Sequence, residues 1–476
     1  MPAHSCHRLI LQSVVLAALT LSGPSSRLPA QESFLKGADI SILNQVELNG
    51  GVFTEDGVVR DPFDIFSDHG VNFARLRLWH TPADGHNNLA ETKLMASRIT
   101  SAGLGFLLAI HYSDTWADPA HQSKPAAWEN LSFPVLIDSV YEYTRDVLTA
   151  LRDQNTLPDI VQIGNEIICG MLWDDGHVCD ADNTPAQWAQ LGEILNEGIR
   201  GVQDALGPND TVKIMIHIDR GGDNAGSQWF FDNLLGQGVD FDLIGLSYYP
   251  WWHGTLTDLQ SNLTDLAQRY EKEIVVVEAS YPWTLAWFDN THNIVGEPEQ
   301  LHSGYPASVE GQRSFLIDLI EIVREVPNEL GTGLFYWAPD WISAPTLGSP
   351  VENLTLFDFQ GEVLSSMDAF DSVLTHVGPT NTPPSLFICS QNFPNPFNPV
   401  TTIAYSIQEE AFVVLEIHDL LGRRVRTLLR GRQNAGRYQV IWDGTGEGGE
   451  SMSSGVYISM LNVNSDRVGR RMVLLR

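Results

Sequence analysis

The sequence predicts an α/β protein in which a (β/α)8 TIM barrel, residues 31–377, precedes a small all-β sandwich, residues 391–476. Eight short apolar runs alternate with longer stretches of helical period before residue 380, and short runs of alternating apolar and polar residues follow it. The charge changes at the same place, from 16 basic against 51 acidic residues in 31–385 to ten against eight in 386–476. Such a break indicates two separate folding units.

Residues 1–30 are predicted to be a signal peptide. An apolar run, residues 9–22, follows His4, His7 and Arg8, and small or turn-forming residues continue to Ala30. The run is short for a bilayer span, and no later stretch reaches 18 apolar residues without a charge, so we expect an exported chain without a transmembrane segment. The alternative is a buried N-terminal helix, which would carry polar residues on one face.

The eight apolar runs suit strands that are buried on both faces, as in a parallel sheet with helical crossovers. They cover residues 34–40, 71–78, 104–110, 159–163, 212–218, 241–246, 274–277 and 333–337. Helical period is found in residues 89–102, 133–153, 185–206, 256–270 and 309–326. Eight strand and helix units fit a (β/α)8 barrel. A doubly wound open sheet is the alternative, but no Gly-rich phosphate turn follows the first run.

The active site of such a barrel lies at the carboxyl ends of the strands, and there the sequence places two glutamates, Glu166 and Glu278. A carboxyl group that ends an apolar strand is costly unless it is solvated, paired or used in chemistry. Glycoside cleavage needs such a pair, because one carboxyl protonates the leaving oxygen and the other attacks the anomeric carbon or activates water. The alternative is a structural ion pair with Arg75 or Arg77.

Strands four and seven lie across the barrel mouth, so we expect the two carboxyls within about 5–5.5 Å, a separation that gives retention of configuration. An arginine could hold Glu278 ionised while Glu166 stays protonated, and Asn165 could donate to the sugar 2-hydroxyl. The predicted substrate-binding residues are Asp39, Arg75, Arg77, His111, Asp114, Trp116, Asn165, His217, Tyr248, Trp283 and Trp337. The histidines could instead be core residues, and each tryptophan could serve packing alone.

Composition excludes some classes of function. The net charge of −31 argues against nucleic-acid binding through a broad basic face. The predicted chemistry requires no cofactor, and the four cysteines lack the spacing of zinc ligands. Cys169 and Cys179, ten residues apart, are either a disulfide of an oxidising compartment or two free thiols.

The chain resembles glycoside hydrolase family 53, the arabinogalactan endo-β-1,4-galactanases. The matching stretches are residues 37–41, 70–79, 111–119, 124–128, 162–167, 170–173 and 276–283. The resemblance implies that Glu166 is the acid/base and Glu278 the nucleophile, and that the substrate is the β-1,4-galactan of type I arabinogalactan and pectin, cut internally. The residues alone leave open another retaining endo-glycanase of the same barrel clan, acting on mannan, xylan or glucan, or a non-catalytic glycan-binding surface protein.

The resemblance also suggests a structural calcium ion. Some bacterial members of the family bind calcium between the loops after strands seven and eight. Asp289, His292 and Asn293 supply donors at short spacing in this chain, and Asn353 or Asp358 could add another. The alternative is a polar loop without metal.

The C-terminal segment is expected to hold a linker, residues 378–390, and a β-sandwich. Its strand-like runs are residues 402–407, 411–418, 425–429, 436–442 and 455–463. Residues 392–399, 401–405, 419–422, 442–444 and 454–457 resemble the type A sorting domain of type IX secretion. That resemblance implies outer-membrane secretion machinery as a partner and a secreted or surface-attached protein. The alternative is a carbohydrate-binding module, although Trp442 is its single tryptophan.

Overall fold

The computed structural model describes residues 34–371, 387–389, 392, 395, 397–407, 410–419, 422–434, 436–464 and 466–476. The predicted signal peptide lies outside the described residues, as does the predicted linker except for residues 387–389. The chain divides into two compact units, Met1–Ser372 and Val373–Arg476. Among the described residues, none of the helices combines the length and apolar character needed to cross a bilayer.

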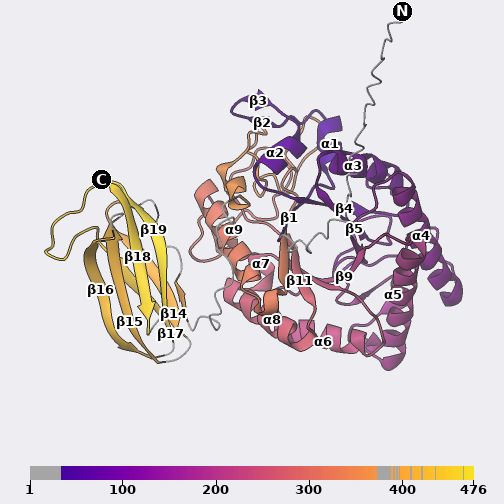
Figure 1. Cartoon of the computed structure of the whole chain (residues 1–476). Coiled ribbons are helices and arrows are strands. Elements are labelled where there is room, and N and C mark those ends of the chain that lie inside the picture. The colour runs from indigo at the N-terminus through magenta and orange to yellow at the C-terminus, as the bar shows by residue number, and fades with distance from the viewer. Residues whose placement is uncertain are drawn as a thin grey trace, which may run out of the picture. The chain divides into compact units, whose positions relative to one another are not determined.

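Eight parallel strands of the first unit close into a barrel, which confirms the predicted fold class (Figure 1). They are β1 (Leu35–Asp39), β4 (Phe73–Leu78), β5 (Gly105–Ile110), β6 (Ile160–Ile163), β9 (Lys213–Ile218), β10 (Leu243–Tyr248), β11 (Glu273–Ala279) and β12 (Gly331–Trp337). Strand β1 pairs in parallel with both β4 and β12, which closes the ring. Each strand overlaps one of the predicted apolar runs.

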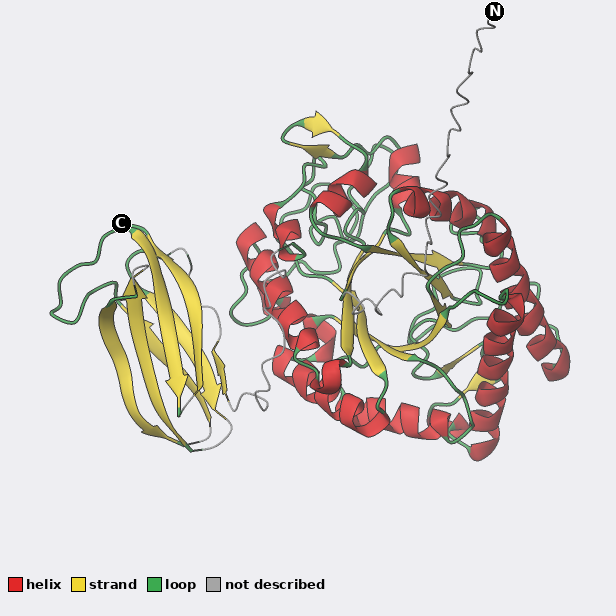
Figure 2. Ribbon diagram, viewed as in Figure 1, coloured by secondary structure: helices red, strands yellow, loops and turns green. Residues whose placement is uncertain are grey.

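Helices surround the barrel, as Figure 2 shows in red around the yellow strands. The longer ones are α2 (Pro62–Asp68), α3 (Leu89–Ser101), α4 (Phe133–Asp153), α5 (Pro185–Ala205), α6 (Asn224–Leu235), α8 (Leu256–Tyr270) and α9 (Val309–Arg324). Several of these helices begin at a polar N-cap residue. At the start of α8, Thr255 and Asp258 form a capping box, in which each side chain accepts from the backbone N–H of the other residue. The sequence did not predict α2 and α6, because α2 is short and α6 has a weakly amphipathic pattern.

The loops of the barrel unit contain short helices, hairpins and 3-10 turns. They are α1 (Leu43–Leu48), α7 (Pro250–His253), the hairpins β2 (Thr54–Glu55) with β3 (Val58–Val59) and β7 (Gly170–Met171) with β8 (Gly176–His177), and the 3-10 turns η1 (Asp180–Asp182), η2 (Pro298–Gln300), η3 (Pro327–Glu329) and η4 (Ser365–Ala369). Several of them lie directly after barrel strands, where they frame the active face.

Apolar side chains fill the barrel interior below the strand ends. The buried cluster consists of Leu107, Ala109, Ile160, Met215, Leu243, Val275, Val277 and Phe335. Two strand glycines make room for rings, since a Cβ at Gly37 would lie 2.0 Å from Phe335 and one at Gly105 would lie 2.1 Å from Phe73. The floor is therefore closed, and polar side chains gather only above it.

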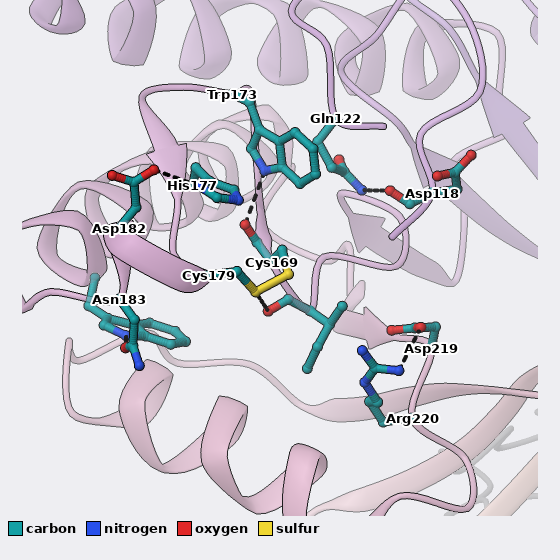
Figure 3. Close-up of a disulfide and its surroundings, with 12 residues drawn as sticks. Asp118, Gln122, Cys169, Trp173, His177, Cys179, Asp182, Asn183, Asp219 and Arg220 are labelled. Atoms are coloured by element: carbon teal, nitrogen blue, oxygen red, sulfur yellow. Dashed lines mark hydrogen bonds and ion pairs between the residues drawn. A yellow bond between two sulfur atoms is a disulfide. The ribbon is translucent and has the colours of Figure 1, made fainter. Parts of the chain in front are cut away.

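A disulfide joins Cys169 to Cys179 across a Cα distance of 5.0 Å (Figure 3). The bond closes the loop that carries β7 and β8, directly after β6. Inside that loop the Trp173 indole donates to the Cys169 carbonyl oxygen at 3.0 Å. Of the two alternatives left open by the sequence, the structure has the disulfide.

The second unit contains two antiparallel sheets, which confirms an all-β C-terminal domain. One sheet holds β13 (Phe387–Cys389), β14 (Thr401–Ile407) and β17 (Gly436–Trp442); the other holds β15 (Ala411–Asp419), β16 (Arg424–Gln433), β18 (Gly455–Val463) and β19 (Asp466–Leu474). Trp442 is fully buried in the core of this unit. Strand β19 was not predicted, because three arginines and a glycine interrupt its apolar residues.

Candidate active site

A cavity of about 600 Å³ lies at the carboxyl ends of the barrel strands. Nine of the predicted residues line it: Asp39, Arg75, Arg77, His111, Trp116, Asn165, Glu166, Glu278 and Trp337. These residues come from both halves of the barrel sequence, and only the closed sheet brings them together. The cavity is thus built where the fold class predicts an active site.

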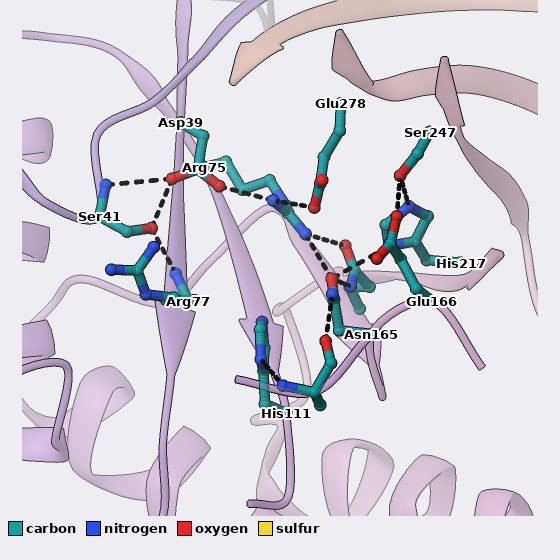
Figure 4. A network of polar contacts seen from close by, with 12 residues as sticks. Asp39, Ser41, Arg75, Arg77, His111, Asn165, Glu166, His217, Ser247 and Glu278 are labelled. Atoms are coloured by element: carbon teal, nitrogen blue, oxygen red, sulfur yellow. Dashed lines mark hydrogen bonds and ion pairs between the residues drawn. The ribbon is translucent and has the colours of Figure 1, made fainter. Parts of the chain in front are cut away.

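Arg75 connects the polar groups at the floor of this cavity (Figure 4). Its guanidinium pairs with Asp39 Oδ2 at 2.5 Å and with Glu278 Oε1 at 2.8 Å. It also donates to Gln162 Oε1 at 3.1 Å and to Asn165 Oδ1 at 2.8 Å. Arg75 is 1% exposed, so it fixes these groups from within the barrel and compensates two buried carboxylates.

Glu278 lies near the end of β11, between a cation and a hydroxyl group. Besides the Arg75 ion pair, Glu278 Oε2 accepts a hydrogen bond from the Tyr249 hydroxyl at 3.0 Å. Burial raises the pKa of Glu278, and the positive charge of Arg75 opposes that rise. A carboxylate held between a cation and a hydroxyl, yet facing the cavity, is suited to act as a nucleophile.

Glu166 lies three residues after β6, and no ion pair to it is found among the described residues. Its backbone has φ of 50°, in the left-handed region, after Gly164 at φ of 76°, so the chain turns sharply at the strand end. Ser247 hydrogen-bonds to Glu166 Oε1 at 2.6 Å. Burial and the negative charge of Glu278 raise the pKa of Glu166 well above its usual range. The two carboxyls therefore differ in the way that an acid and a nucleophile must differ.

His217 supports this pair from behind the cavity wall. Its Nε2 lies 2.9 Å from Ser247 Oγ, and its Nδ1 lies 3.1 Å from Asn165 Oδ1. Burial and the charge of Arg75 lower the pKa of His217 well below its usual range, so the ring is neutral. The His217 side chain is fully buried and is not among the residues that line the cavity, so its contact with substrate stays a prediction.

Asn165 is fixed by its neighbours. Its Oδ1 accepts from Arg75, Gln162 and His217, and its Nδ2 donates to the Ala117 carbonyl oxygen at 2.9 Å. The second hydrogen on Nδ2 remains for the cavity, where the residue contributes to the lining.

Aromatic side chains form one wall of the cavity around Arg77. The Arg77 guanidinium lies 4.1 Å from the centre of the Trp116 ring. Trp116 is parallel to Trp341 within 8° and meets Trp337 edge-on at 6.3 Å. Burial lowers the pKa of Arg77 to about 10. Flat indole faces of this kind pack against the C–H faces of sugars.

Three predicted substrate contacts lie away from the cavity. The Asp114 carboxylate accepts from the backbone of Thr81 and Ala126 and thereby joins two loops. Tyr248 is buried on the outer side of β10, where its ring stacks on Phe315 of α9. Trp283 packs against Phe359, 4.7 Å between ring centres. These three side chains are not among the residues that line the cavity, so their contacts with substrate stay predictions.

Further residues line the cavity beside those predicted to contact substrate. They include Asp219, Arg220, Tyr249, Trp251, Trp252, His253 and Trp341. Asp219 and Tyr249 directly follow strand ends, and Trp341 follows β12 by four residues, so the rule that active-site residues follow barrel strands points to all three. Arg220 and His253 had no such signal, and His253 lies on α7, a four-residue helix that periodicity does not detect.

The loop after β11 holds the residues predicted to bind calcium. Asp289 accepts from Ser343 Oγ at 2.6 Å and from the Ser349 backbone, and His292 packs against Trp287. The Asn293 side chain is buried, and neither its oxygen nor its nitrogen has a hydrogen-bond partner. Within the part of the chain that the structure describes, no three His, Cys, Asp or Glu side chains cluster as metal ligands. Carboxylate and amide oxygens fit the chemistry of calcium, and the unpaired Asn293 oxygen is the group that fits best.

Replacing Arg75 by methionine is expected to destabilise the barrel by about 3–5 kcal/mol, because Asp39 and Glu278 would remain buried without their cation. Urea unfolding followed by tryptophan fluorescence measures this loss, since only Trp442 reports from the second unit. Arg145→Met is the matched control. The Arg145 side chain lies at the surface in its pair with Asp146, so we expect no measurable change in the free energy of unfolding.

Both parts of the chain match known protein families. The model of glycosyl hydrolase family 53 matches residues 35–370, and the model of the FlgD Ig-like domain matches residues 400–466. An uncharacterised protein of Niallia circulans is 48% identical over 351 residues, 72% of this chain and 95% of that protein. An arabinogalactan endo-β-1,4-galactanase of Thermothelomyces thermophilus is 38% identical over 321 residues, 65% of this chain and 90% of that enzyme. The solved catalytic domain from Ignisphaera aggregans, described as GH53, has 40% identity and a TM-score of 0.67, covering 73% of this chain and 98% of its own.

Proposed function

The chain belongs to glycosyl hydrolase family 53, and on that premise we propose that it is an endo-β-1,4-galactanase that cuts the galactan of type I arabinogalactan by a retaining mechanism. The observation that carries the proposal is the pair Glu166 and Glu278, two buried carboxyls that line one cavity, of which only Glu278 is ion-paired with Arg75 among the described residues. The galactanase among the relatives supports the choice of galactan over mannan, xylan or glucan.

Glu278 attacks the anomeric carbon in the first step, and Glu166 gives its proton to the glycosidic oxygen that leaves. Arg75 and Tyr249 hold Glu278 ionised and oriented before the attack. Water then hydrolyses the glycosyl enzyme with Glu166 as the base, so two displacements give net retention. The free N–H of Asn165 donates to the 2-hydroxyl as positive charge develops on the ring.

The neighbours of Glu166 support its protonated form before the reaction. Asn165 Oδ1 accepts from Arg75, so the neutral His217 must carry its proton on Nδ1, facing that oxygen. The Ser247 hydroxyl lies within hydrogen-bond distance of both His217 Nε2 and Glu166 Oε1, at 2.9 Å and 2.6 Å, and it has one hydrogen to donate. A proton on Glu166 completes this chain of hydrogen bonds, whereas an ionised Glu166 would compete with His217 for the single Ser247 hydrogen.

Hydrolysis assays on galactan, mannan, xylan and cellulose in parallel test the proposed substrate. We expect short oligosaccharides from galactan, produced by internal cuts. Release from another glycan alone would point to a different endo-glycanase, and binding without release would point to a glycan-binding protein. Proton NMR of the first anomer released tests retention separately, and an initial α-anomer would contradict the double displacement.

Calcium at Asp289, His292 and Asn293 is part of the proposal, with a purely structural role. We expect calcium to raise the melting temperature of the chain over that in EDTA, because binding to the folded state alone stabilises it. Asn293→Ala should remove most of that rise. An equal rise in the variant would show that the ion binds elsewhere.

Export through the C-terminal unit is also part of the proposal. Its all-β fold and its match to an Ig-like domain are compatible with a sorting role, as is the resemblance of residues 392–399 to a sorting signal. Expression of the chain with and without residues 373–476 in a host with type IX secretion machinery tests this role. We expect the full chain outside the cell and the truncated chain in the periplasm.

A further inference from the structure

A second cavity adjoins the active site beside the predicted acid. Its volume is about 300 Å³, and it shares Asp219, Arg220, Trp252 and His253 with the larger cavity. Asp219 directly follows β9, and Trp252 and His253 belong to α7. Because the two cavities share these residues, they lie next to each other beyond the ends of β9 and β10.

The acid determines which end of the substrate enters this space. A general acid must lie beside the oxygen that leaves, so the leaving sugar lies on the Glu166 side of the scissile bond. Glu166 is hydrogen-bonded to Ser247 of β10, and the negative charge of Asp219 helps to raise the pKa of Glu166. Glu278, in contrast, is held by Arg75. The side of the cavity that contains Asp219 is therefore the leaving-group side.

Asp219 presents an oxygen that has no donor. The residue is 6% exposed, and its Oδ2 pairs with Arg220 at 3.3 Å (Figure 3). Its Oδ1 is buried and makes no hydrogen bond within the described residues. Leaving a buried acceptor unpaired is costly, and a sugar hydroxyl in the cavity would supply the missing donor. Trp252, which is 62% exposed, offers an indole face beside it.

We propose that Asp219 binds the sugar on the leaving-group side of the scissile bond, with Oδ1 accepting a hydroxyl and Trp252 packing against the ring. The ligand is a neutral, hydroxyl-rich sugar unit of the chain that is being cut. This inference rests on the proposed function and assigns a specificity-determining residue to it.

Two substrates separate this role from a structural one. Galactan places a sugar with several hydroxyls on the leaving-group side, whereas an aryl β-galactobioside places there an aryl ring that has no hydroxyl to donate to Asp219. We expect Asp219→Ala to lower kcat/KM on galactan about 10- to 100-fold, as expected for a lost hydrogen bond to a charged group. The same variant should stay within about threefold of the wild type on the aryl substrate. Trp252→Ala, a change at an exposed side chain, should lower kcat/KM on both substrates, because an aryl ring can pack on the indole as a sugar can.

Asp219→Asn keeps an oxygen in place while it removes the charge. We expect it to recover most of the galactan activity and to move the upper limb of the pH profile to lower pH, because the charge of Asp219 raises the pKa of Glu166. The charged groups that act on Glu166 are Glu278, Asp219 and Arg75, and those that act on Asp219 are Arg220, Asp223 and Asp118.

The control is Asp146→Ala on the outer surface of α4, where the side chain is 68% exposed, and it should match the wild type on both substrates. Melting temperatures confirm that the variants are folded. In Asp219→Ala, equal losses on both substrates, or no loss on galactan, would overturn the inference. The proposed function would still stand in that case if the wild type hydrolyses galactan. An inactive wild type would overturn both.

Discussion

Glu278→Gln is expected to lower turnover of galactan by at least about 10⁴-fold while galactan still binds. The amide cannot attack the anomeric carbon, so no glycosyl enzyme forms on any substrate. The variant keeps the size of the side chain and the neighbouring Tyr249 hydroxyl, so the cavity retains its shape. Single-turnover assays measure the loss, and calorimetry with a galacto-oligosaccharide measures the binding.

Two comparisons make this result specific. Aryl galactosides with good leaving groups should fail equally in Glu278→Gln, because the missing step is the attack and not the protonation. In Glu278→Ala, where the shorter side chain leaves room for an anion, azide should restore cleavage of activated substrates and should give the inverted product. Galactan hydrolysis near the wild-type rate would remove Glu278 from the mechanism.

Glu166→Gln is expected to lower kcat/KM on galactan by about 10²- to 10⁴-fold, the usual contribution of general acid catalysis. The loss should be much smaller in the first step with aryl galactosides, because a good leaving group needs little protonation. The pH profile gives a second readout. In the wild type, activity needs a protonated Glu166, so it falls as pH rises through the raised pKa of that residue. The variant should lack this upper limb, and an unchanged limb would assign the acid elsewhere.

The same substitution tests the environment of Glu166 through stability. A carboxyl whose pKa is raised in the folded state stabilises the protein fully below its unfolded pKa, and this contribution is lost as pH rises through the folded pKa. We therefore expect Glu166→Gln to melt above the wild type at neutral and alkaline pH, and to match it near pH 4. A lower melting temperature throughout would contradict a buried, protonated acid.

The barrel could be predicted from the sequence because all eight strands are buried on both faces and read as apolar runs. The same rule located Glu166 and Glu278, since a carboxyl at such a strand end is conspicuous. Helix α6 escaped prediction because its apolar residues are spread around the helix, as in Phe230 and Phe231. Packing against the barrel, rather than its own pattern, stabilises it.

The details of the site depend on side-chain direction, which proximity to a strand end does not give. Leu243 points into the barrel, and side chains alternate along a strand, so Ser247 of β10 points inward and Tyr248 points outward. This alternation would have shown that Tyr248 faces away from the site. Tyr249 lies beyond the end of the strand, where side chains no longer alternate. Its hydrogen bond to Glu278 could therefore be seen only in the folded structure. The connections of Arg75 to Asp39, Gln162 and Asn165 likewise depend on how three strands are aligned.

The disulfide implies that a reducing agent would act on one loop at the carboxyl end of the barrel and leave the sheet in place. Cys169 follows Glu166 by three residues, and the loop that the bond closes carries β7 and β8. Glu278, in contrast, lies within β11 and is paired with Arg75. Thiol treatment is therefore expected to increase the mobility of the chain next to Glu166 more than that of the chain around Glu278.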